Sequence, residues 1–377
     1  MRSLVNLKIY LARQYAKLYS KDLFIGVTGS VGKTTCVKAC VAVLSQKFKT
    51  LSTVSNLDPS LNIPTTLLKL TPQTKKVVLE MGIEHKEEMD FYLSLIKPKV
   101  VIVTRIAYAH SEFLGDLNEI VQEKGKLIEQ LSEGDVAILN WDDPNSKKLA
   151  SKCKGTIIYY GSDPKNCIVW AGNIQVADFK TTFELNLGVE RVKVNYNLLG
   201  SHQVYAALAA AALGVLYDIP LTKIKLGLES VQPEEHSLQA LLGPNGSIIL
   251  DDTLNCSPIS LEAAIDTMLK IPGRRRVLVL GEMRDLGVYS DALHRQIAQV
   301  IYKEKIDLVI LGQGEAKIIA DELKSLGFWE EKLQFNLQNS QIVSKLLKTL
   351  GKGDVCLIKG SRASRLDEVV KRIAKRS

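Results

Sequence analysis

The sequence lacks the features that mark membrane-spanning, secreted and zinc-finger proteins. It has no uninterrupted apolar run of about 18 residues, the length that a membrane-spanning helix needs. Residues 1–22 intersperse basic residues with leucines and tyrosines at helical spacing, without the apolar stretch or the cleavage site of a signal peptide. The six cysteines form no Cys-x-x-Cys pair and have no histidine partners at zinc-ligand spacing. We therefore expect a cytoplasmic protein with reduced, mostly buried thiols.

Large blocks of like charge are also missing. The formal net charge is +8, but the basic residues are spread along the chain, and the two clusters at 274–276 and 371–376 are short. A nucleotide and anionic substrates explain this balance at least as well as nucleic acid does. We expect small-molecule partners, and neither nucleic acid nor a membrane.

What the chain does contain is an alternation of strand-like and helical patterns over 377 residues, a length that accommodates two domains. In the first half this rhythm is that of a mostly parallel sheet wrapped by helices. The strand-like runs cover 23–27, 77–80, 100–104 and 136–140. Short alternating pieces at 157–160, 183–187 and 192–196 predict an antiparallel annex at the sheet edge, and an alanine-rich helix is predicted over 200–217.

A second αβ series follows a break near residues 231–236. Its four strand-like runs, with helical patterns between them, predict a smaller, doubly wound Rossmann-like domain. These runs cover 247–251, 276–280, 308–311 and 355–359. We therefore expect the α/β fold class, with a linker helix over 1–22, a central domain over 23–233 and a C-terminal domain over 234–377. The cleft between two such domains is the default place for a substrate.

The most informative motif is the glycine-rich segment 26–35, GVTGSVGKTT, which follows an apolar run and opens a helical pattern. The backbone N–H groups of such a loop close around nucleotide phosphates. Lys33 would place a cation on the β and γ oxygens, and the hydroxyl of Thr34 can ligate Mg²⁺. The loop residues that we expect to contact the nucleotide are Gly29, Ser30, Gly32, Lys33, Thr34 and Thr35.

Three residues downstream are candidates for cation binding. Glu80 ends a strand-like run beside the loop, where it is either a Mg²⁺ ligand or one half of a salt bridge. His110 follows the next strand and is as often an ordinary polar residue as a ligand. Lys124 has the spacing of a solvated lysine on a helix. A buried lysine with a lowered pKa, however, can add CO₂ and become an anionic carbamate, which ligates a hard cation.

The order of these blocks resembles the Mur ligase family over nearly the whole chain. Within the family, the last three blocks are most similar to the enzymes that add D-alanyl-D-alanine to UDP-N-acetylmuramoyl-tripeptide in peptidoglycan synthesis. The blocks are GVTGSVGKTT (26–35), LEMG (79–82), residues 104–110, EKGK (123–126), LNWDD (139–143), LLGSHQVYAALAAAA (198–212), DDTLNCSP (251–258), VLGEMRDLG (279–287) and KGSR (359–362).

The resemblance implies an ATP-dependent ligase that forms an amide bond through an acyl phosphate, and it assigns roles to individual residues. Lys33 would hold the ATP phosphates. Two Mg²⁺ sites are implied, the first formed by Thr34 and Glu80 and the second by His110 and carbamylated Lys124. The nucleotide would also meet Asn140, His202, Gln203, Asp251 and Asn255. The incoming substrate or the closed domain interface would meet Asp252, Lys359, Ser361 and Arg362.

The sequence departs from the family pattern in several places. We expect the separate N-terminal domain that grips UDP in the family to be missing, because residues 7–21 already resemble the linker helix. UDP recognition would then fall to another polypeptide, or the acceptor would be a different carboxylate. Where the family has a Gly-Arg pair near the domain junction, this chain has His236-Ser237, and Arg274 or Arg284 could compensate. Further departures from the family lie at Arg105, Gln203, Ala206, Leu254 and Ser257.

Three alternatives to the cell-wall ligase follow from these departures. The same chemistry could serve a free peptide or an amino-acid polymer as acceptor. A non-catalytic ATP-binding subunit is a second alternative, but all five of the residues proposed for phosphate and cation binding are intact. A DNA-partitioning ATPase would explain the basic charge but not the second αβ domain with its KGSR block.

Overall fold

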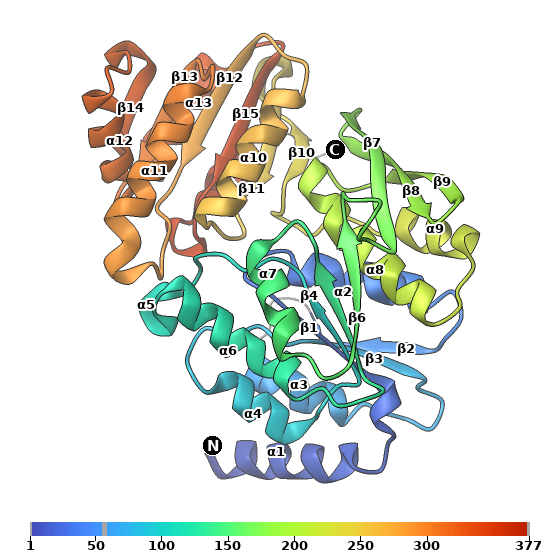
Figure 1. The fold of residues 1–377 in the computed structure, drawn as a ribbon. Coiled ribbons are helices and arrows are strands. Elements are labelled where there is room, and N and C mark those ends of the chain that lie inside the picture. The colour runs from blue at the N-terminus through green and yellow to red at the C-terminus, as the bar shows by residue number, and fades with distance from the viewer. Residues whose placement is uncertain (1, 55–58, 375–377) are drawn as a thin grey trace.

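In the computed structural model, which describes residues 2–54 and 59–374, the chain folds around two separate β-sheets with helices on their faces (Figure 1). The first sheet has nine strands in the order β2-β3-β1-β4-β5-β6-β7-β8-β9. The pairs from β2 to β7 are parallel, and β7, β8 and β9 pair antiparallel. The strands are β1 Phe24–Thr28, β2 Thr50–Ser52, β3 Lys76–Glu80, β4 Val100–Val103, β5 Val136–Asn140, β6 Thr156–Gly161, β7 Val169–Ala177, β8 Lys180–Leu187 and β9 Glu190–Tyr196.

The expected antiparallel annex is partly wrong. Residues 157–160 belong to β6, which continues the parallel sheet beside β5, so the antiparallel part begins only with β7. Strand β7 was not predicted, because a Gly-Asn pair interrupts its pattern and much of the strand is exposed. Its pairing with β8 shifts register between Gly172 and Gln175, as expected of a bulge.

Helices on the two faces of the first sheet bury two separate cores. Helices α2, α8 and α9 cover one face, and α1, α3, α4 and α6 cover the other. The helices of this half are α1 Arg2–Ala16, α2 Lys33–Leu44, α3 Pro59–Leu67, α4 Glu88–Leu95, α5 Ser111–Leu114, α6 Leu117–Glu129, α7 Pro144–Lys148, α8 Val204–Leu216 and α9 Leu221–Glu229.

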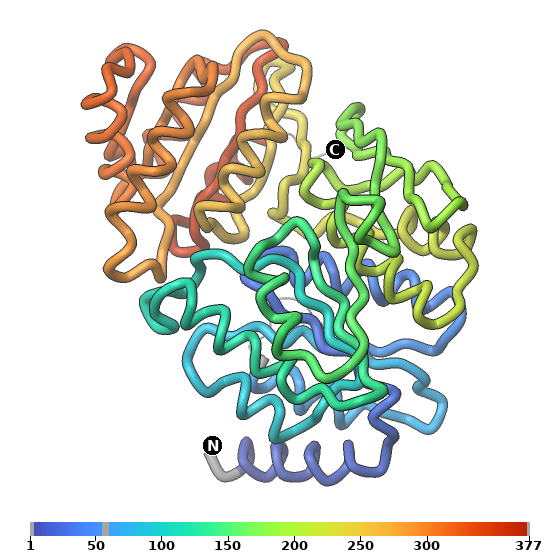
Figure 2. The backbone as a smooth tube through the Cα atoms, in the orientation of Figure 1, coloured from blue at the N-terminus to red at the C-terminus, as the bar shows by residue number. Residues whose placement is uncertain are grey.

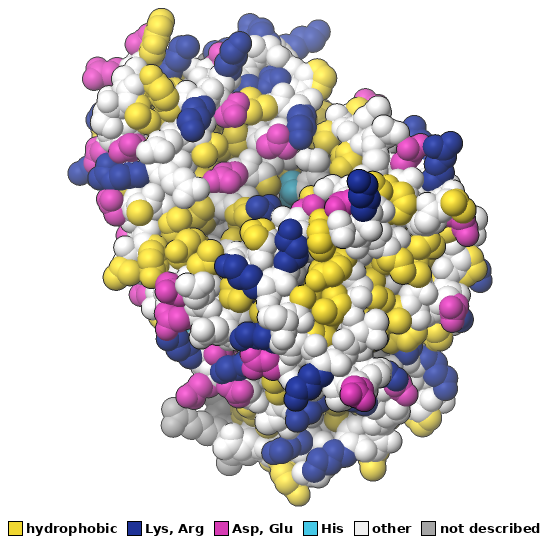
Figure 3. Space-filling model, viewed as in Figure 1, with side chains coloured by type: hydrophobic (Ala, Val, Ile, Leu, Met, Phe, Trp, Pro, Cys, Tyr) yellow, Lys and Arg dark blue, Asp and Glu magenta, His cyan; other side chains and the backbone are white. Residues whose placement is uncertain are grey.

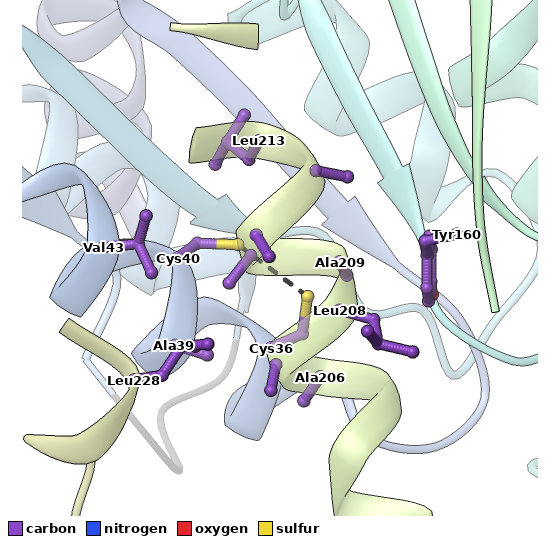
Figure 4. Packing of buried hydrophobic residues seen from close by; sticks show 14 of the residues in the cluster. Cys36, Ala39, Cys40, Val43, Tyr160, Ala206, Leu208, Ala209, Leu213 and Leu228 are labelled. Atoms are coloured by element: carbon purple, nitrogen blue, oxygen red, sulfur yellow. Dashed lines mark hydrogen bonds between the residues drawn. The ribbon is translucent and has the colours of Figure 1, made fainter. Parts of the chain in front are cut away.

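Small side chains allow α2 to pack closely against α8 (Figure 4). Cys36 and Cys40 lie one turn apart on α2, with their sulfur atoms 3.9 Å apart, and face the alanines of α8. All six cysteines are free thiols and five are buried, Cys153 being partly exposed, which confirms the expectation for thiols. Burial raises the pKa of Cys40 well above its usual value, so this thiol is unreactive.

The second sheet has six strands in the order β10-β11-β15-β12-β13-β14, with only the β10–β11 pair antiparallel. The sequence predicted four of them; the other two, β10 and β14, are short, partly exposed strands at the edges of the sheet. The strands are β10 Gln239–Leu242, β11 Ile248–Asp252, β12 Arg275–Leu280, β13 Leu308–Gly312, β14 Leu333–Leu337 and β15 Asp354–Lys359. The helices are α10 Pro258–Lys270, α11 Ser290–Lys303, α12 Ala316–Ser325, α13 Asn339–Thr349 and α14 Leu366–Ile373.

The second sheet lies at the upper left of the view and the first sheet at its centre and right, and the chain passes from one to the other after α9 (Figure 2). On the face shown in Figure 3, Lys and Arg side chains are scattered among acidic ones, in agreement with their spread along the sequence. Within residues 2–54 and 59–374, no helix combines the length and apolar character needed to cross a bilayer.

The close packing of α9 on α2 gives a test of the fold. A Cβ on Gly227 would lie 2.7 Å from the carbonyl oxygen of Ala42 and 2.8 Å from the Cα of Val43, and neither backbone atom can swing away. We expect Gly227→Ala to lower the free energy of unfolding by about 1–3 kcal/mol, measured by urea denaturation. Gly172→Ala is the control, since the nearest atoms there are side-chain atoms at 3.7 and 3.9 Å. Equal losses in the two variants would contradict this packing.

Candidate active site

The glycine-rich loop connects β1 to α2 and leaves the N-terminus of α2 open. Gly29 has a φ of 143°, and a Cβ there would lie 2.0 Å from Oγ1 of Thr104. Gly32 has a φ of 78°, and a Cβ there would meet nothing within 4 Å. The helix begins at Lys33 without a side-chain cap, so its first N–H groups have no partner within the helix. Unpaired N–H groups and the positive end of the helix dipole suit a phosphate.

Two neighbours fix the loop and its lysine. Ser30 donates its hydroxyl to the carbonyl of Ala107 over 2.7 Å and accepts from the Ala107 N–H over 3.0 Å, so its side chain holds the loop in place. Lys33 Nζ donates to the carbonyl of Ser30 over 3.2 Å. A Cβ on Gly82 would lie 2.8 Å from Cε of Lys33, so the lysine runs directly along this glycine.

Oxygen donors gather beside Lys33, at the carboxyl ends of β1 and β3. The hydroxyl of Thr34 lies 3.1 and 3.0 Å from the two carboxylate oxygens of Glu80. The N–H of Glu80 donates to the hydroxyl of Thr53 over 2.9 Å, which fixes the end of β3. A hydroxyl and a carboxylate next to a phosphate loop are the hard donors that Mg²⁺ prefers, so these residues fit that ion.

His110 and Lys124 face the same place from two other elements. His110 caps α5 with a left-handed φ of 54°. Its pKa is lowered by burial and by the charge of Lys33, so the imidazole is neutral at pH 7 with a lone pair for a cation. Lys124, on α6, is only 1% exposed. Burial holds its pKa well below the usual range, and the charge of Lys33 lowers it further.

Asn140, His202 and Gln203 have different surroundings. The amide of Asn140 donates to the Thr104 carbonyl over 3.0 Å, and its oxygen accepts from the Asp142 N–H, so this side chain is already engaged. Gln203 lines a small cavity together with Thr35, Lys38, Glu234 and Ser237. Ser237, which stands where the family has an arginine, therefore faces α2, the helix that follows the phosphate loop.

His202 lies deeper, next to the second sheet. Burial lowers its pKa to about 4, and the nearby charges include Asp252 and Lys359. Its Nδ1 is buried and meets no hydrogen-bond partner among the described residues. A Cβ on Gly200 would lie 2.8 Å from this nitrogen and 2.7 Å from Oγ1 of Thr267, which shows how tightly the imidazole is enclosed.

The candidates of the second sheet cluster at the carboxyl ends of β11 and β15. Lys359 Nζ donates to Asp252 over 2.6 Å and to the carbonyl of Asn255 over 2.8 Å. Asp251 lies 2.7 Å from Nδ1 of His236 and accepts from the hydroxyl of Thr253 over 2.7 Å. The ion pair of Lys359 and Asp252 is therefore central to this cluster. Asp251 instead contacts His236, the residue that precedes Ser237.

Ser361 and Arg362 follow β15 at the same edge. Ser361 donates its N–H to the carbonyl of Glu282 over 3.1 Å, and Arg362 is exposed. The expectation that Arg274 could replace the family arginine is wrong. Arg274 pairs with Asp354 at the amino end of β15, the opposite edge of the sheet from the cluster. Arg284 lies after β12 and is 3.5 Å from Glu282, so it stays a candidate.

Sequence reasoning missed one residue that reaches across the molecule. Asp285, in the loop after β12, places its carboxylate 3.3 Å from Nδ1 of His110. It stands within the VLGEMRDLG block, where a charged residue follows a buried strand, but nothing in the sequence indicated which residue it faces.

The comparisons with known proteins agree with this geometry. The Mur ligase middle domain matches residues 27–214, and the Mur ligase glutamate ligase domain matches residues 238–362. A protein of Escherichia coli named UDP-N-acetylmuramoyl-tripeptide--D-alanyl-D-alanine ligase is 31% identical over 92% of this chain and 76% of its own length. The chain belongs to the Mur ligase family. It is an ATP-dependent, amide-forming ligase, the activity of this family.

Other members of the family support the same placement. A Bacillus subtilis protein with the same name is 30% identical over 98% of this chain and 80% of its own. MurF from Acinetobacter baumannii has the same fold, with a TM-score of 0.88 at 24% identity over 97% of this chain and 80% of that one. MurF from Thermotoga maritima, solved in complex with ADP, has a TM-score of 0.85 at 23% identity over 98% of this chain and 83% of that one.

The enclosed His202 predicts a pH dependence of stability. The folded protein keeps this imidazole neutral down to pH about 4, whereas the unfolded chain protonates it near pH 6.5. Stability is therefore lost as the pH falls through this window, by an amount on the order of 2–3 kcal/mol. We expect His202→Gln to flatten the pH dependence of the unfolding free energy between pH 6.5 and 4.

The matched control is His85→Gln, because the His85 side chain is 56% exposed. Urea denaturation at several pH values measures both variants. If the unfolding free energy of His202→Gln falls between pH 6.5 and 4 as steeply as that of the wild type, the prediction that the fold keeps this imidazole neutral is wrong.

Proposed function

We propose that this ligase joins D-alanyl-D-alanine to the carboxylate of UDP-N-acetylmuramoyl-tripeptide, with ATP as the driving substrate, in peptidoglycan precursor synthesis. The observation that carries the proposal is the gathering of Lys33, Thr34, Glu80, His110 and Lys124 around the phosphate loop in a chain 31% identical to an enzyme of that name. Because ATP and nucleotide-linked precursors are cytoplasmic, we place the reaction in the cytoplasm. The domains that we propose for it are 23–233 and 234–377, preceded by the helix of 1–22.

The chain's own residues supply positive charge where two anions must meet. A carboxylate oxygen of the acceptor attacks the γ-phosphorus, ADP leaves, and an acyl phosphate forms. Lys33 and the N–H groups at the start of α2 offset the repulsion between carboxylate and phosphate. The amine of D-alanyl-D-alanine then attacks the acyl carbon, phosphate leaves, and the amine loses a proton to give the amide.

The oxygen and nitrogen donors around Lys33 fit two Mg²⁺ ions. Thr34 and Glu80 would hold the first, and His110 and carbamylated Lys124 the second. Bound Mg²⁺ would neutralise phosphate charge and so make the γ-phosphorus a better electrophile. The burial of Lys124, which lowers its pKa, supports the carbamate, because only an unprotonated amine adds CO₂. Its nitrogen forms a bond to the carbon of CO₂ and releases one proton, which leaves one negative charge on the carbamate.

Residues at the carboxyl ends of β11 and β15, in the second sheet, would complete the site. Asp251, at the end of β11, and Asn255, which follows it, would approach the nucleotide, and His202 lies near the charges of Asp252 and Lys359. Lys359, Ser361 and Arg362 would face the incoming amine. A site divided between two halves can exclude water when they close, which protects an acyl phosphate from hydrolysis.

The deciding experiment measures phosphate release by the purified protein with ATP and Mg²⁺. The assay is run with and without UDP-N-acetylmuramoyl-tripeptide and D-alanyl-D-alanine, and the new peptide bond is followed by mass. We expect release only when both substrates are present, together with the pentapeptide product. Absence of stimulation would contradict these substrates and favour another carboxylate acceptor, a separate UDP-binding protein, or a non-catalytic subunit.

The role of Lys124 has its own test. We expect Lys124→Ala to abolish amide formation, because the anionic ligand is lost, and a small carboxylate such as acetate in the buffer to restore part of the rate. Lys152→Ala is the control, since Lys152 forms an exposed ion pair with Glu129 at the end of the same helix and such a pair contributes little. Wild-type turnover by Lys124→Ala, or loss without any rescue, would count against the carbamate.

A further inference from the structure

A loop of the second sheet is seated on the helix that His110 begins. Residues 284–289, which follow β12, contact α5 through both backbone and side chains. Glu112 donates its N–H to the carbonyl of Asp285 over 3.0 Å, and Ser111 donates its hydroxyl to the carbonyl of Leu286 over 3.2 Å. A Cβ on Gly287 would lie 2.8 Å from the Cα of Glu112, so the two backbones are in direct contact.

Aromatic packing extends the same contact. The rings of Tyr108 and Tyr289 lie 5.1 Å apart, one on each side of the interface. Tyr108 precedes His110 by two residues, so the segment that carries the imidazole is held on both sides. The position of His110 therefore depends on a loop that belongs to the other half of the molecule.

The side chain of Asp285 points at the imidazole itself. Its Oδ2 lies 3.3 Å from Nδ1 of His110, which is buried and forms no hydrogen bond in this arrangement. Both residues have left-handed backbones, with φ of 61° at Asp285 and 54° at His110. A small rotation of the ring would direct an Nδ1–H group at the carboxylate.

We propose that Asp285 is a positioning residue that fixes His110 with its proton on Nδ1, leaving the lone pair of Nε2 for the second cation. The inference rests on the proposed function, which makes His110 a ligand of that cation. A carboxylate behind a metal-binding histidine sets its tautomer, orients the ring and raises its basicity.

The second cation site would therefore depend on residues from both halves of the molecule. The first cation would be held by Thr34 of α2 and Glu80 of β3, which both belong to the first half. The second would depend on His110, whose ring is oriented by Asp285 of the other half. Loss of the Asp285 carboxylate should therefore weaken the second cation and spare the first.

The test is a titration with Mn²⁺ as a probe for Mg²⁺, in the presence of a non-hydrolysable ATP analogue, with free Mn²⁺ followed by electron paramagnetic resonance. Asp285→Gly removes the carboxylate and keeps the left-handed backbone without strain. We expect two Mn²⁺ ions in the wild type, and in this variant a second ion bound about 10- to 100-fold more weakly with the first unchanged. Asp285→Asn keeps the shape and left-handed backbone and should weaken the second ion in the same direction.

The control is Asp291→Asn, because Asp291 is exposed and pairs with Arg295 within its own helix. Wild-type binding of both ions by the two Asp285 variants, while His110→Ala loses the second ion, would overturn the positioning role and leave the ligand role of His110 intact. Binding of both ions by His110→Ala would overturn the ligand assignment and the inference with it. Equal weakening of both ions in the Asp285 variants would show a general structural effect and also overturn the inference.

Discussion

The hydroxyl of Thr104 is the constraint on which the phosphate loop depends. It donates to the carbonyl of Val31 over 2.7 Å, with the carbonyl of Thr28 at 3.2 Å, and so ties the loop to the end of the neighbouring strand. The backbone of Gly29 passes so close to this hydroxyl that no side chain fits there. Because the loop is pinned at this point, the start of α2 and the side chains of Lys33 and Thr34 have fixed positions relative to Glu80.

Much of the first half could be predicted from the sequence, since its buried parallel strands are continuous apolar runs and its loop motif has a strict backbone requirement. The strands β1, β3, β4 and β5 lie within one or two residues of the expected ranges. Strands at the edges of the second sheet, β10 and β14, escaped prediction because they are short and only partly buried, so they form no continuous apolar run.

The candidate site divides in the same way. A residue at the end of a buried strand, such as Glu80, could be placed beside the loop from strand order alone. The burial of Lys124 could not, because the pattern of α6 does not reveal that this lysine faces inward. Contacts across the two halves, such as that of Asp285 with His110, depend on how the sheets are arranged and are invisible to local pattern. Arg274, by contrast, comes just before the expected strand 276–280, so its place at the amino end of β12, away from the site, could have been predicted.

The burial of the thiols has a practical consequence. Five of the six cysteines lie inside the protein, two of them on the helix that starts at the phosphate loop, and only Cys153 is partly exposed. A thiol-reactive fluorophore should therefore meet one modestly accessible native position. Cysteines introduced on the surfaces of the two halves could then be labelled almost without background, which would allow the distance between the sheets to be followed in solution during turnover.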